Sequence, residues 1–276
     1  MSASVSFKVP TQRGPQGVSV AYARVGEGEP LVLLHGIGHH RQAWDPVVDI
    51  LAAEREVIAV DLPGFGASPA LPDGMAYDLP TTNTVLGALF EALDLDRPHV
   101  AGNSLGGLLA LELGRERRAR SVTALSPAGF WSEAERRYAF GVLIAMRQIS
   151  QRLPVPLVER LARTAAGRTA LTSTIYARPA RRSPEAVVAE TLALARATGF
   201  DATLRSGASV RFTDDLPGIP VTVGWGTRDM LLVRRQGVRA KQIIPKARLV
   251  RLPGCGHCPM SDDPALVARV ILDGSH

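Results

Sequence analysis

The sequence of 276 residues contains only two cysteines, Cys255 and Cys258, and it lacks long apolar runs. Because the two cysteines lie close together, a disulfide between them would not staple a chain of this length, and we expect a reduced protein of the cytoplasm. No apolar run approaches the ~20 residues that cross a bilayer, and the first residues lack the apolar segment of a signal peptide. The composition predicts neither a membrane span nor a disulfide-stapled fold.

Lysine is also scarce, since it occurs only at Lys8, Lys241 and Lys246, and arginine supplies nearly all of the positive charge. The net charge of +6 makes nucleic-acid binding one interpretation. However, the arginines are interspersed with acidic residues, aromatic residues make up only 5% of the chain, and no nucleic-acid-binding motif accompanies them. We therefore expect arginines on solvated helix faces and no nucleic-acid partner.

Hydrophobic residues make up 46% of the sequence, which is enough for a large core. Short apolar runs bounded by glycine or proline are typical of strands buried on both faces of a sheet. After an opening hairpin at 4–9 and 17–26, such strands are expected at 30–36, 55–66, 98–104, 121–129, 220–229 and 247–254. Segments with helical spacing lie between them, at 43–54, 81–95, 105–117, 234–244 and 263–272. This alternation predicts an α/β fold with a mostly parallel sheet and helices on both faces.

The strand–helix alternation breaks between residues 130 and 213, which are helical in pattern and rich in arginine. We expect this segment to be a helical cap, and residues 1–129 and 214–276 to form one core domain. Its first helix carries an apolar stripe at helical spacing. Most of that stripe is expected to be core, and Phe130, Trp131 and Leu143 are expected to line part of a pocket for a mainly apolar substrate.

The motif that carries chemistry is Gly-Asn-Ser-Leu-Gly at 102–106, which places Ser104 between an expected strand and an expected helix. A nucleophile on such a tight turn needs glycine at Gly102 and Gly106, because side chains there would collide with neighbouring backbone. The turn raises the serine oxygen above the sheet edge and next to a helix N-terminus, whose dipole favours negative charge. The motif and its context predict a nucleophilic serine.

A serine nucleophile also needs a base, an acid that orients the base, and donors for an oxyanion. Asp229 and His257 follow the last two expected strands, and the end of the stretch at 121–129, Leu-Ser-Pro-Ala-Gly, offers no carboxylate as an alternative acid. The backbone N–H groups of Ile37 and Leu105 are the expected oxyanion donors. His35 and Gly36 precede Ile37, and we expect His35 to orient this loop rather than to transfer protons.

Five motifs occur in order: HGIG at 35–38, DLPGFGAS at 61–68, GNSLGG at 102–107, GTRD at 226–229 and GCGHCPMSDDP at 254–264. Through them the chain resembles α/β-hydrolases of the epoxide-hydrolase and haloperoxidase-like branch, from about residue 31 to about residue 272 apart from the insert. The resemblance implies an eight-stranded core, a helical cap, and a triad of Ser104, Asp229 and His257 in the chain order typical of this fold.

The identity of the nucleophile narrows the expected reaction. Epoxide hydrolases and haloalkane dehalogenases of this branch carry aspartate where Ser104 stands, whereas a serine activated by histidine attacks carbonyl carbon. We expect hydrolysis of a carboxylic ester, thioester or lactone of a small-molecule substrate, without metal or organic cofactor. Hydrolysis of a C–C bond in meta-cleavage products and cofactor-free perhydrolysis are the alternatives among enzymes. A small-molecule receptor that retains the triad is the alternative outside catalysis, and both a monomer and a homodimer remain open.

Two further patterns carry competing interpretations. Cys255 and Cys258 have the spacing of a thiol–disulfide exchange site, but they lie late in the chain, in the loop that carries His257, rather than after a first strand. We therefore expect no redox role, although an oxidised thiol that displaces His257 remains an alternative. His39 and His40 resemble a metal pair but lack partners at ligand spacing, so a polar loop rim is expected instead.

Overall fold

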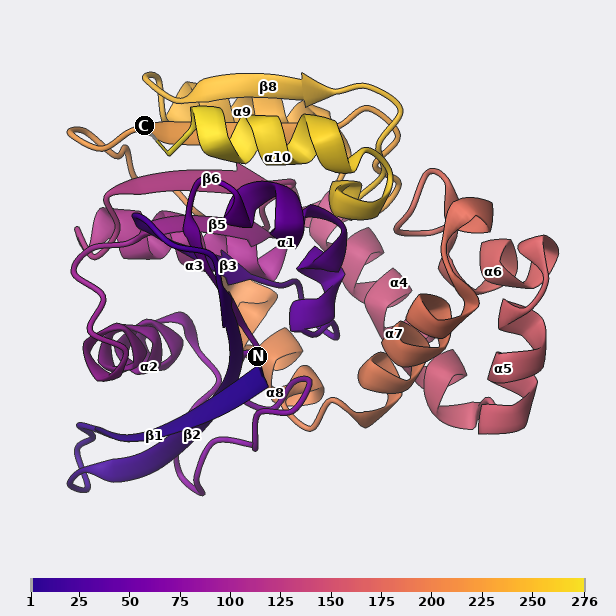
Figure 1. Ribbon diagram of the computed structural model, residues 1–276, viewed down its shortest axis with the longest axis horizontal. Helices are drawn as coiled ribbons and strands as arrows, with labels where there is room; N and C mark the ends of the chain where they lie inside the picture. The colour runs from indigo at the N-terminus through magenta and orange to yellow at the C-terminus, as the bar shows by residue number, and fades with distance from the viewer. Residues whose placement is uncertain (1, 276) are drawn as a thin grey trace.

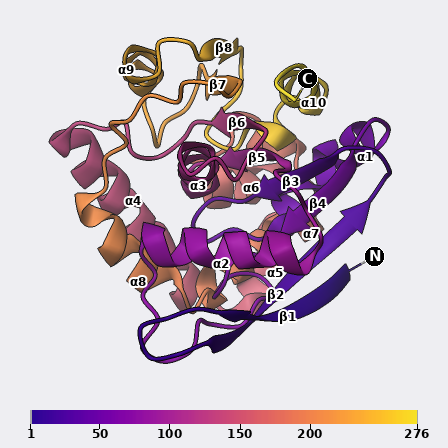
Figure 2. The same cartoon turned by 90° about the vertical axis from the view of Figure 1, so that its left-hand side faces the viewer.

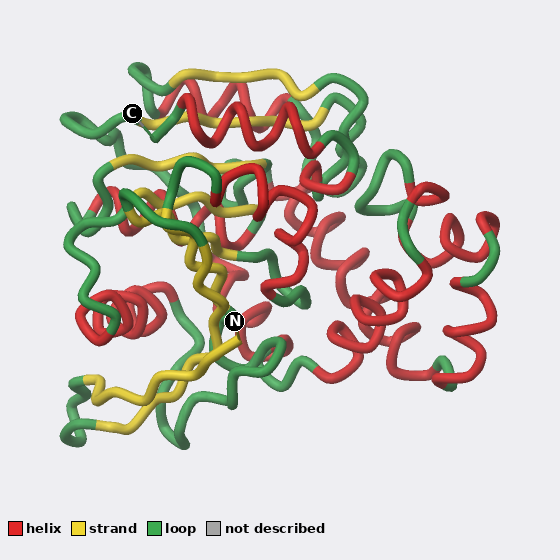
Figure 3. Tube along the Cα trace, viewed as in Figure 1, coloured by secondary structure: helices red, strands yellow, loops and turns green. Residues whose placement is uncertain are grey.

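The computed structural model describes residues 2–275 and contains a mostly parallel eight-stranded sheet with helices on both faces (Figures 1 and 3). The strand order is β1-β2-β4-β3-β5-β6-β7-β8, with β1, β2 and β4 paired antiparallel and the remaining pairs parallel. This architecture confirms the predicted fold class. The strands are β1 (Ser2–Val9), β2 (Gln16–Val25), β3 (Pro30–Leu34), β4 (Glu56–Val60), β5 (His99–Asn103), β6 (Ser121–Leu125), β7 (Val221–Gly226) and β8 (Arg248–Leu252).

The central strands are buried on both faces, as their continuous apolar runs predict. Every residue of β5, β6 and β7 is buried, whereas β8 at the sheet edge exposes most of its side chains. Helices α1 (Asp45–Ala52) and α10 (Pro264–Asp273) cover one face of the sheet. Helices α2 (Leu79–Ala92), α3 (Leu105–Arg115) and α9 (Arg235–Ile243) cover the other face (Figure 2).

One helix start differs from the sequence-based expectation. The helix expected over 81–95 begins at Leu79 instead. The carboxylate of Asp78 accepts the backbone N–H of Thr81 at 2.9 Å and so caps the helix. Proline at the second helical position, which has no N–H to satisfy, is compatible with this earlier start.

Between β6 and β7 the chain forms five α-helices and contributes no strand to the sheet. They are α4 (Glu133–Arg152), α5 (Val155–Ala162), α6 (Ala165–Thr172), α7 (Pro184–Arg196) and α8 (Phe200–Ser206). A capping box starts α4, in which the hydroxyl of Ser132 and the carboxylate of Glu135 each accept the backbone N–H of the other residue. In Figure 1, α4 to α7 lie beyond the end of the sheet toward which β8 points, so they face the carboxyl ends of the parallel strands.

Among residues 2–275, no helix combines the length and the apolar character that crossing a membrane requires.

Candidate active site

Ser104 occupies a strained turn between the end of β5 and the start of α3. Its φ of 57° and ψ of −114° lie in a region that residues with a side chain rarely adopt. The surrounding backbone fixes this conformation: Ser104 N–H donates to the carbonyl of Leu125 on β6, and its own carbonyl accepts from Leu108 and Ala128. Ser104 is therefore held at the N-terminus of α3 with only 8% of its surface exposed.

The glycines on both sides of Ser104 are required by close backbone approaches. A Cβ at Gly102 would lie 2.0 Å from the carbonyl oxygen of Gly106, and one at Gly106 would lie 2.0 Å from that of Leu34 on β3. A Cβ at Gly36 would lie 3.2 Å from the Cβ of Ser104. The start of α3 is thus pressed against the end of β3, which brings the loop after β3 to the serine.

His35 braces that loop by joining the ends of two neighbouring strands. The backbone N–H of Leu62, after β4, donates to His35 Nε2 at 3.0 Å, so Nδ1 carries the proton and donates to the carbonyl of Gly36 at 2.8 Å. Burial lowers the pKa of His35 to about 4, so the ring is neutral near pH 7. The adjacent turn is held by Asp61, which accepts the backbone N–H groups of Arg41 and Ala67.

Asp229 and His257 form a buried pair at the ends of β7 and β8. His257 Nδ1 lies 2.9 Å from Asp229 Oδ2, and the other carboxylate oxygen accepts the backbone N–H groups of Leu231 at 2.9 Å and Leu232 at 2.8 Å. Both oxygens of Asp229 are therefore satisfied, and the carboxylate fixes the orientation of the imidazole. His257 Nε2 then remains to act on a neighbouring group.

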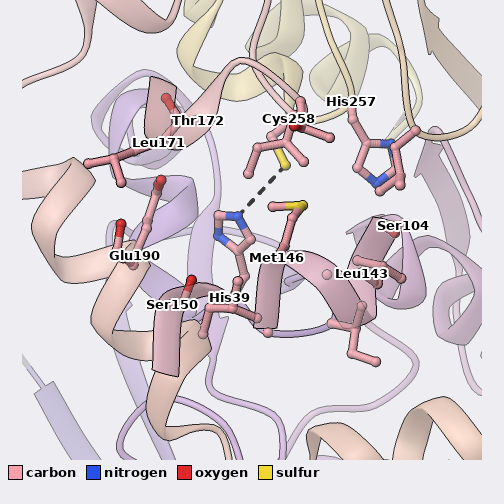
Figure 4. Close-up of a pocket in the computed structure, with 18 of the residues that line it drawn as sticks. His39, Ser104, Leu143, Met146, Ser150, Leu171, Thr172, Glu190, His257 and Cys258 are labelled. Atoms are coloured by element: carbon pink, nitrogen blue, oxygen red, sulfur yellow. Dashed lines mark hydrogen bonds between the residues drawn. The ribbon is translucent and has the colours of Figure 1, made fainter. Parts of the chain in front are cut away.

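Ser104 and His257 line one cavity and lie next to each other in Figure 4. Within residues 2–275, the bond to Asp229 is the only hydrogen bond of the His257 ring, so the serine hydroxyl is near the ring without donating to it. In resting enzymes such contacts are often long and tighten when substrate binds. Ile37 lines the same cavity, and Leu105 follows Ser104 as the first residue of α3.

The loop that carries His257 is held from two sides. Asn103 Nδ2 donates to the carbonyl of His257 at 2.9 Å, which ties the loop to the end of β5. On the other side, Asp262 accepts the backbone N–H groups of Gly256 at 2.8 Å, Ala177 at 3.0 Å and Arg178 at 2.8 Å, which ties it to the inserted segment. The last helix, α10, is capped by Asp263 instead, whose carboxylate accepts the backbone N–H of Leu266.

The cavity has a volume of about 150 Å³ and lies between the core and the inserted helices. An apolar space of this size holds a molecule like benzene. Its walls are mostly apolar, and Leu143 is among them, as expected. Phe130 and Trp131 lie elsewhere: Phe130 packs against Phe212 and Trp131 against Phe140. The inserted segment supplies a large part of the lining, through Leu143, Met146, Ile149, Ser150, Leu153, Ala170, Leu171, Thr172, Thr174, Ile175, Glu190, Thr191 and Leu194.

Two polar side chains of this cavity were not recognised as site residues from the sequence. His39 and His40 were expected on a polar rim, but both are buried, and His39 lines the cavity. Glu190 on α7 is also buried and lines it. A glutamate in the middle of an amphipathic helix gives no sequence signal of burial, because only the packing of α7 against the other inserted helices encloses it.

The two cysteines are free thiols with separate partners. Cys258 Sγ donates to Asn103 Oδ1 at 3.4 Å, whereas Cys255 Sγ lies 3.7 Å from the carbonyl of Pro253. Burial raises the pKa of Cys258 well above its usual range and that of Cys255 to about 12. Since the thiolate is the reactive form, this environment disfavours thiol–disulfide exchange. Within residues 2–275, no cluster of three or more histidine, cysteine or acidic side chains is arranged to hold a metal ion.

Comparison with known proteins agrees with the fold and the motifs. Residues 31–270 match the model of the alpha/beta hydrolase family, so the chain belongs to the α/β-hydrolase family. It is 31% identical over 242 residues to the dihydrolipoyllysine-residue acetyltransferase component of the acetoin cleaving system of Pseudomonas putida. That alignment covers 83% of this chain and 59% of the relative, so the chain spans little more than half of that protein's length.

Shorter alignments join the chain to two named hydrolases. It is 42% identical over 96 residues to the pimeloyl-(acyl-carrier protein) methyl ester esterase of Aeromonas hydrophila, covering 35% of this chain and 36% of that protein. It is 39% identical over 98 residues to the 2-hydroxy-6-oxo-2,4-heptadienoate hydrolase of Pseudomonas putida, covering 34% and 35%. These relatives support a hydrolase and leave its substrate open.

Solved structures share the whole architecture. An esterase from Thermogutta terrifontis superposes with a TM-score of 0.76 at 21% identity, covering 98% of this chain and 97% of that one. The meta-cleavage product hydrolase from Pseudomonas fluorescens IP01 superposes with a TM-score of 0.74 at 20% identity, covering 98% and 96%. At these identities the likeness shows the fold alone.

Proposed function

We propose that this protein is a serine hydrolase that cleaves a carboxylic ester, thioester or lactone of a small, mainly apolar substrate through an acyl-enzyme intermediate. Ser104 is the nucleophile, His257 the general base and acid, and Asp229 the group that orients His257. The observation that carries the proposal is the geometry around one cavity: a serine in a strained turn at a helix N-terminus shares it with a histidine whose Nδ1 is fixed by a buried carboxylate.

The proposed reaction follows from the fixed tautomer of His257. With the proton of Nδ1 directed at Asp229, Nε2 is bare and accepts the proton of the Ser104 hydroxyl as the oxygen attacks the substrate carbonyl. The imidazolium formed then donates this proton to the departing alkoxide. Water repeats the sequence in the second half-reaction, attacks the acyl-serine and releases the acid. The buried carboxylate stabilises the imidazolium in both halves.

The backbone N–H groups of Ile37 and Leu105 are the proposed oxyanion donors. In the part of the chain that the structure describes, neither N–H donates a hydrogen bond to another protein group. Leu105 is the first residue of α3, where the helix dipole favours negative charge. One such donor typically contributes about 3–4 kcal/mol to stabilising the transition state.

We also propose that helices α4 to α8 act as a cap that selects the substrate. They contribute most of the cavity wall away from Ser104, and their lining residues are mainly apolar. An enclosed apolar cavity excludes water from the ester, which strengthens the hydrogen bonds to the oxyanion. The small volume of the cavity favours small acyl or alcohol groups.

Hydrolysis of p-nitrophenyl esters from acetate to decanoate, measured beside Ser104→Ala, tests the proposal. The wild type should turn over the shorter esters, and the variant should lower kcat by roughly 10⁴- to 10⁶-fold, as for other serine nucleophiles. The thermal unfolding midpoint of the variant shows whether the fold is retained. Equal turnover by a folded Ser104→Ala variant would show that the ester is cleaved elsewhere.

C–C bond hydrolysis is a second candidate, favoured by the local similarity to the 2-hydroxy-6-oxo-2,4-heptadienoate hydrolase. The two candidates share the nucleophile and differ in the bond that breaks after attack. A vinylogous ring-fission ketone, whose ultraviolet absorbance falls on cleavage, distinguishes them. Turnover of the ketone without turnover of any ester would assign the chain to the second class, and turnover of neither would favour a receptor.

A further inference from the structure

Two of the buried polar side chains that line the cavity, Glu190 and His39, have no role in the proposed reaction and each has a polar atom without a protein partner in the described chain. Glu190 comes from α7 and is 8% exposed, and His39 comes from the loop after β3 and is 9% exposed. In Figure 4, Glu190 lies on the side of the cavity away from Ser104 and His257, and His39 lies between them. The cavity therefore has a second polar region in addition to the serine and histidine.

Glu190 is held in one orientation, and only one of its two carboxylate oxygens has hydrogen-bond partners in the described chain. Its Oε1 accepts the hydroxyl of Tyr176 at 2.8 Å and a guanidinium N–H of Arg182, whereas its Oε2 is buried and has no protein partner within residues 2–275. Arg182 is fixed in turn, because it donates to Ser261 Oγ at 2.7 Å and its guanidinium stacks 3.8 Å from the centre of the Tyr176 ring. A buried polar atom without a partner costs about 1–3 kcal/mol, which a ligand group can recover.

His39 lines the cavity and carries a second buried atom without a protein partner in the described chain. Its Nε2 lies 3.9 Å from Cys258 Sγ, and its Nδ1 is buried without a protein partner in the described chain. Burial, assisted by the neighbouring His40, lowers the pKa of His39 well below its usual value, so the ring is neutral near pH 7. A neutral imidazole has one protonated and one bare nitrogen, so Nδ1 is either a donor or an acceptor according to the tautomer.

A hydroxyl group fits this pair better than other small groups. It donates one hydrogen bond and accepts others, so with the proton of His39 on Nδ1 it accepts from Nδ1–H and donates to Glu190 Oε2. A methyl group would leave both atoms unpaired. A carboxylate would face the carboxylate of Glu190, and an ammonium would meet the positive charge of Arg182, which already pairs with Glu190.

We propose that Glu190 and His39 form a subsite that binds a hydroxyl group on the end of the substrate remote from the bond that is cleaved. The lining also includes the apolar side chains of Leu143, Met146 and Leu194, and Met146 lies between His39 and Ser104 in Figure 4. The substrate class is therefore an ester whose short apolar chain ends in a hydroxyl. This inference rests on the proposed hydrolase function and adds the identity of the remote group.

The test compares pairs of p-nitrophenyl esters, from butanoate to octanoate, that end in either a hydroxyl or a methyl group. The wild type should prefer the hydroxyl-terminated ester at one chain length by roughly five- to hundredfold in kcat/KM, the factor expected for pairing or orphaning a buried polar group. The acetate ester, too short to reach the subsite, serves as the internal reference.

Two variants test whether Glu190 causes the preference for the hydroxyl-terminated ester. Removal of Glu190 alone would leave the buried charge of Arg182 unpaired and destabilise the fold, so both are replaced in Arg182→Met/Glu190→Met, because apolar replacement of a whole ion pair is often tolerated. This variant should lose the hydroxyl preference, measured as the ratio of kcat/KM for the hydroxyl- and methyl-terminated esters of one chain length. Glu190→Gln is the substitute if the double variant does not fold. It retains groups able to bond Tyr176 and Arg182, and it should reduce the hydroxyl preference partly. Glu135→Gln is the matched control, because Glu135 is equally buried, pairs with Arg235 and Arg239, and does not line the cavity.

The outcomes separate this inference from the proposed function. Turnover that depends on Ser104 without a hydroxyl preference at any chain length would overturn the subsite and leave the hydrolase standing. A preference as large as that of the wild type in Arg182→Met/Glu190→Met, or in Glu190→Gln where only that variant folds, would also overturn it. If no ester is hydrolysed, calorimetry with methyl ω-hydroxyhexanoate and methyl hexanoate decides: tighter binding of the hydroxy ester supports the subsite, and equal binding refutes it.

Discussion

The substitution Asp229→Asn tests the most specific feature of the site, the fixed tautomer of His257. The carboxylate has two roles, since Oδ1 accepts the backbone N–H groups of Leu231 and Leu232, and Oδ2 accepts His257 Nδ1–H. An asparagine has only one oxygen. If its NH₂ group faced the two backbone N–H groups, two buried donors would be orphaned at about 1–3 kcal/mol each. The oxygen should therefore face the backbone, and the NH₂ group should face His257.

In that orientation the asparagine donates to Nδ1, so the proton of the imidazole moves to Nε2. A protonated Nε2 cannot accept the proton of Ser104, although the ring has not moved. We expect kcat to fall by roughly 10⁴-fold, or about 5.5 kcal/mol in activation free energy, with little change in KM and in the thermal unfolding midpoint.

The assay is steady-state hydrolysis of p-nitrophenyl butanoate by wild type and variant, with thermal unfolding measured on the same preparations. Asp263→Asn is the control, because Asp263 caps α10 and asparagine caps a helix equally well. A folded Asp229→Asn variant with kcat within about tenfold of wild type would refute the tautomer argument, since the wrong tautomer predicts a far larger loss.

Three further predictions follow from contacts and burial. Gly106→Ala should destabilise the fold by about 3 kcal/mol or more, since the new Cβ would lie 2.0 Å from the carbonyl oxygen of Leu34, and an unchanged urea midpoint would contradict this packing. Cys255 and Cys258, whose thiol pKa values burial raises, should not react with Ellman's reagent at neutral pH until urea unfolds the chain; rapid labelling of the native protein would reopen the redox alternative. Burial lowers the pKa of His35 to about 4 from 6.5, so the unfolded chain binds a proton below pH 6.5 that the folded chain does not. Stability should therefore be unaffected by His35 above pH 6.5 and fall by about 3 kcal/mol as the pH drops to about 4, and a urea midpoint that stays constant from pH 7 to pH 5 would argue against a buried neutral His35.

The elements of the core were predictable because their signals are local. The run 30–36 is apolar and bounded by proline and glycine, and it forms β3, buried in the centre of the sheet. The order of strands, helices and glycines around Ser104 likewise predicted the strained turn that the structure contains. The error at the start of α2 is also local: Asp78 caps the helix by accepting the backbone N–H of Thr81, and Pro80 is compatible with a first turn that begins before Thr81.

The identity of the lining residues was not predictable in the same way. Phe130 and Trp131 are aromatic and follow β6 closely, yet they pack against Phe212 and Phe140 rather than along the cavity. Helical periodicity gives the face on which a side chain lies but not the partner that this face meets. The partner of Phe130 is Phe212, which is far away in the chain and meets Phe130 only in the folded protein.

The sequence by itself determined the fold family, the strained serine turn, and the order of serine, aspartate and histidine along the chain, because each depends on short-range spacing and on residues with special backbone chemistry. The tertiary structure alone decided that Asp262 ties the His257 loop to the inserted segment and that Glu190 is clamped by Tyr176 and Arg182. Only the tertiary structure shows that His39 lines the cavity. The physical reason is that burial and hydrogen-bond pairing are properties of segments brought together by folding, and no single segment carries them in its own pattern.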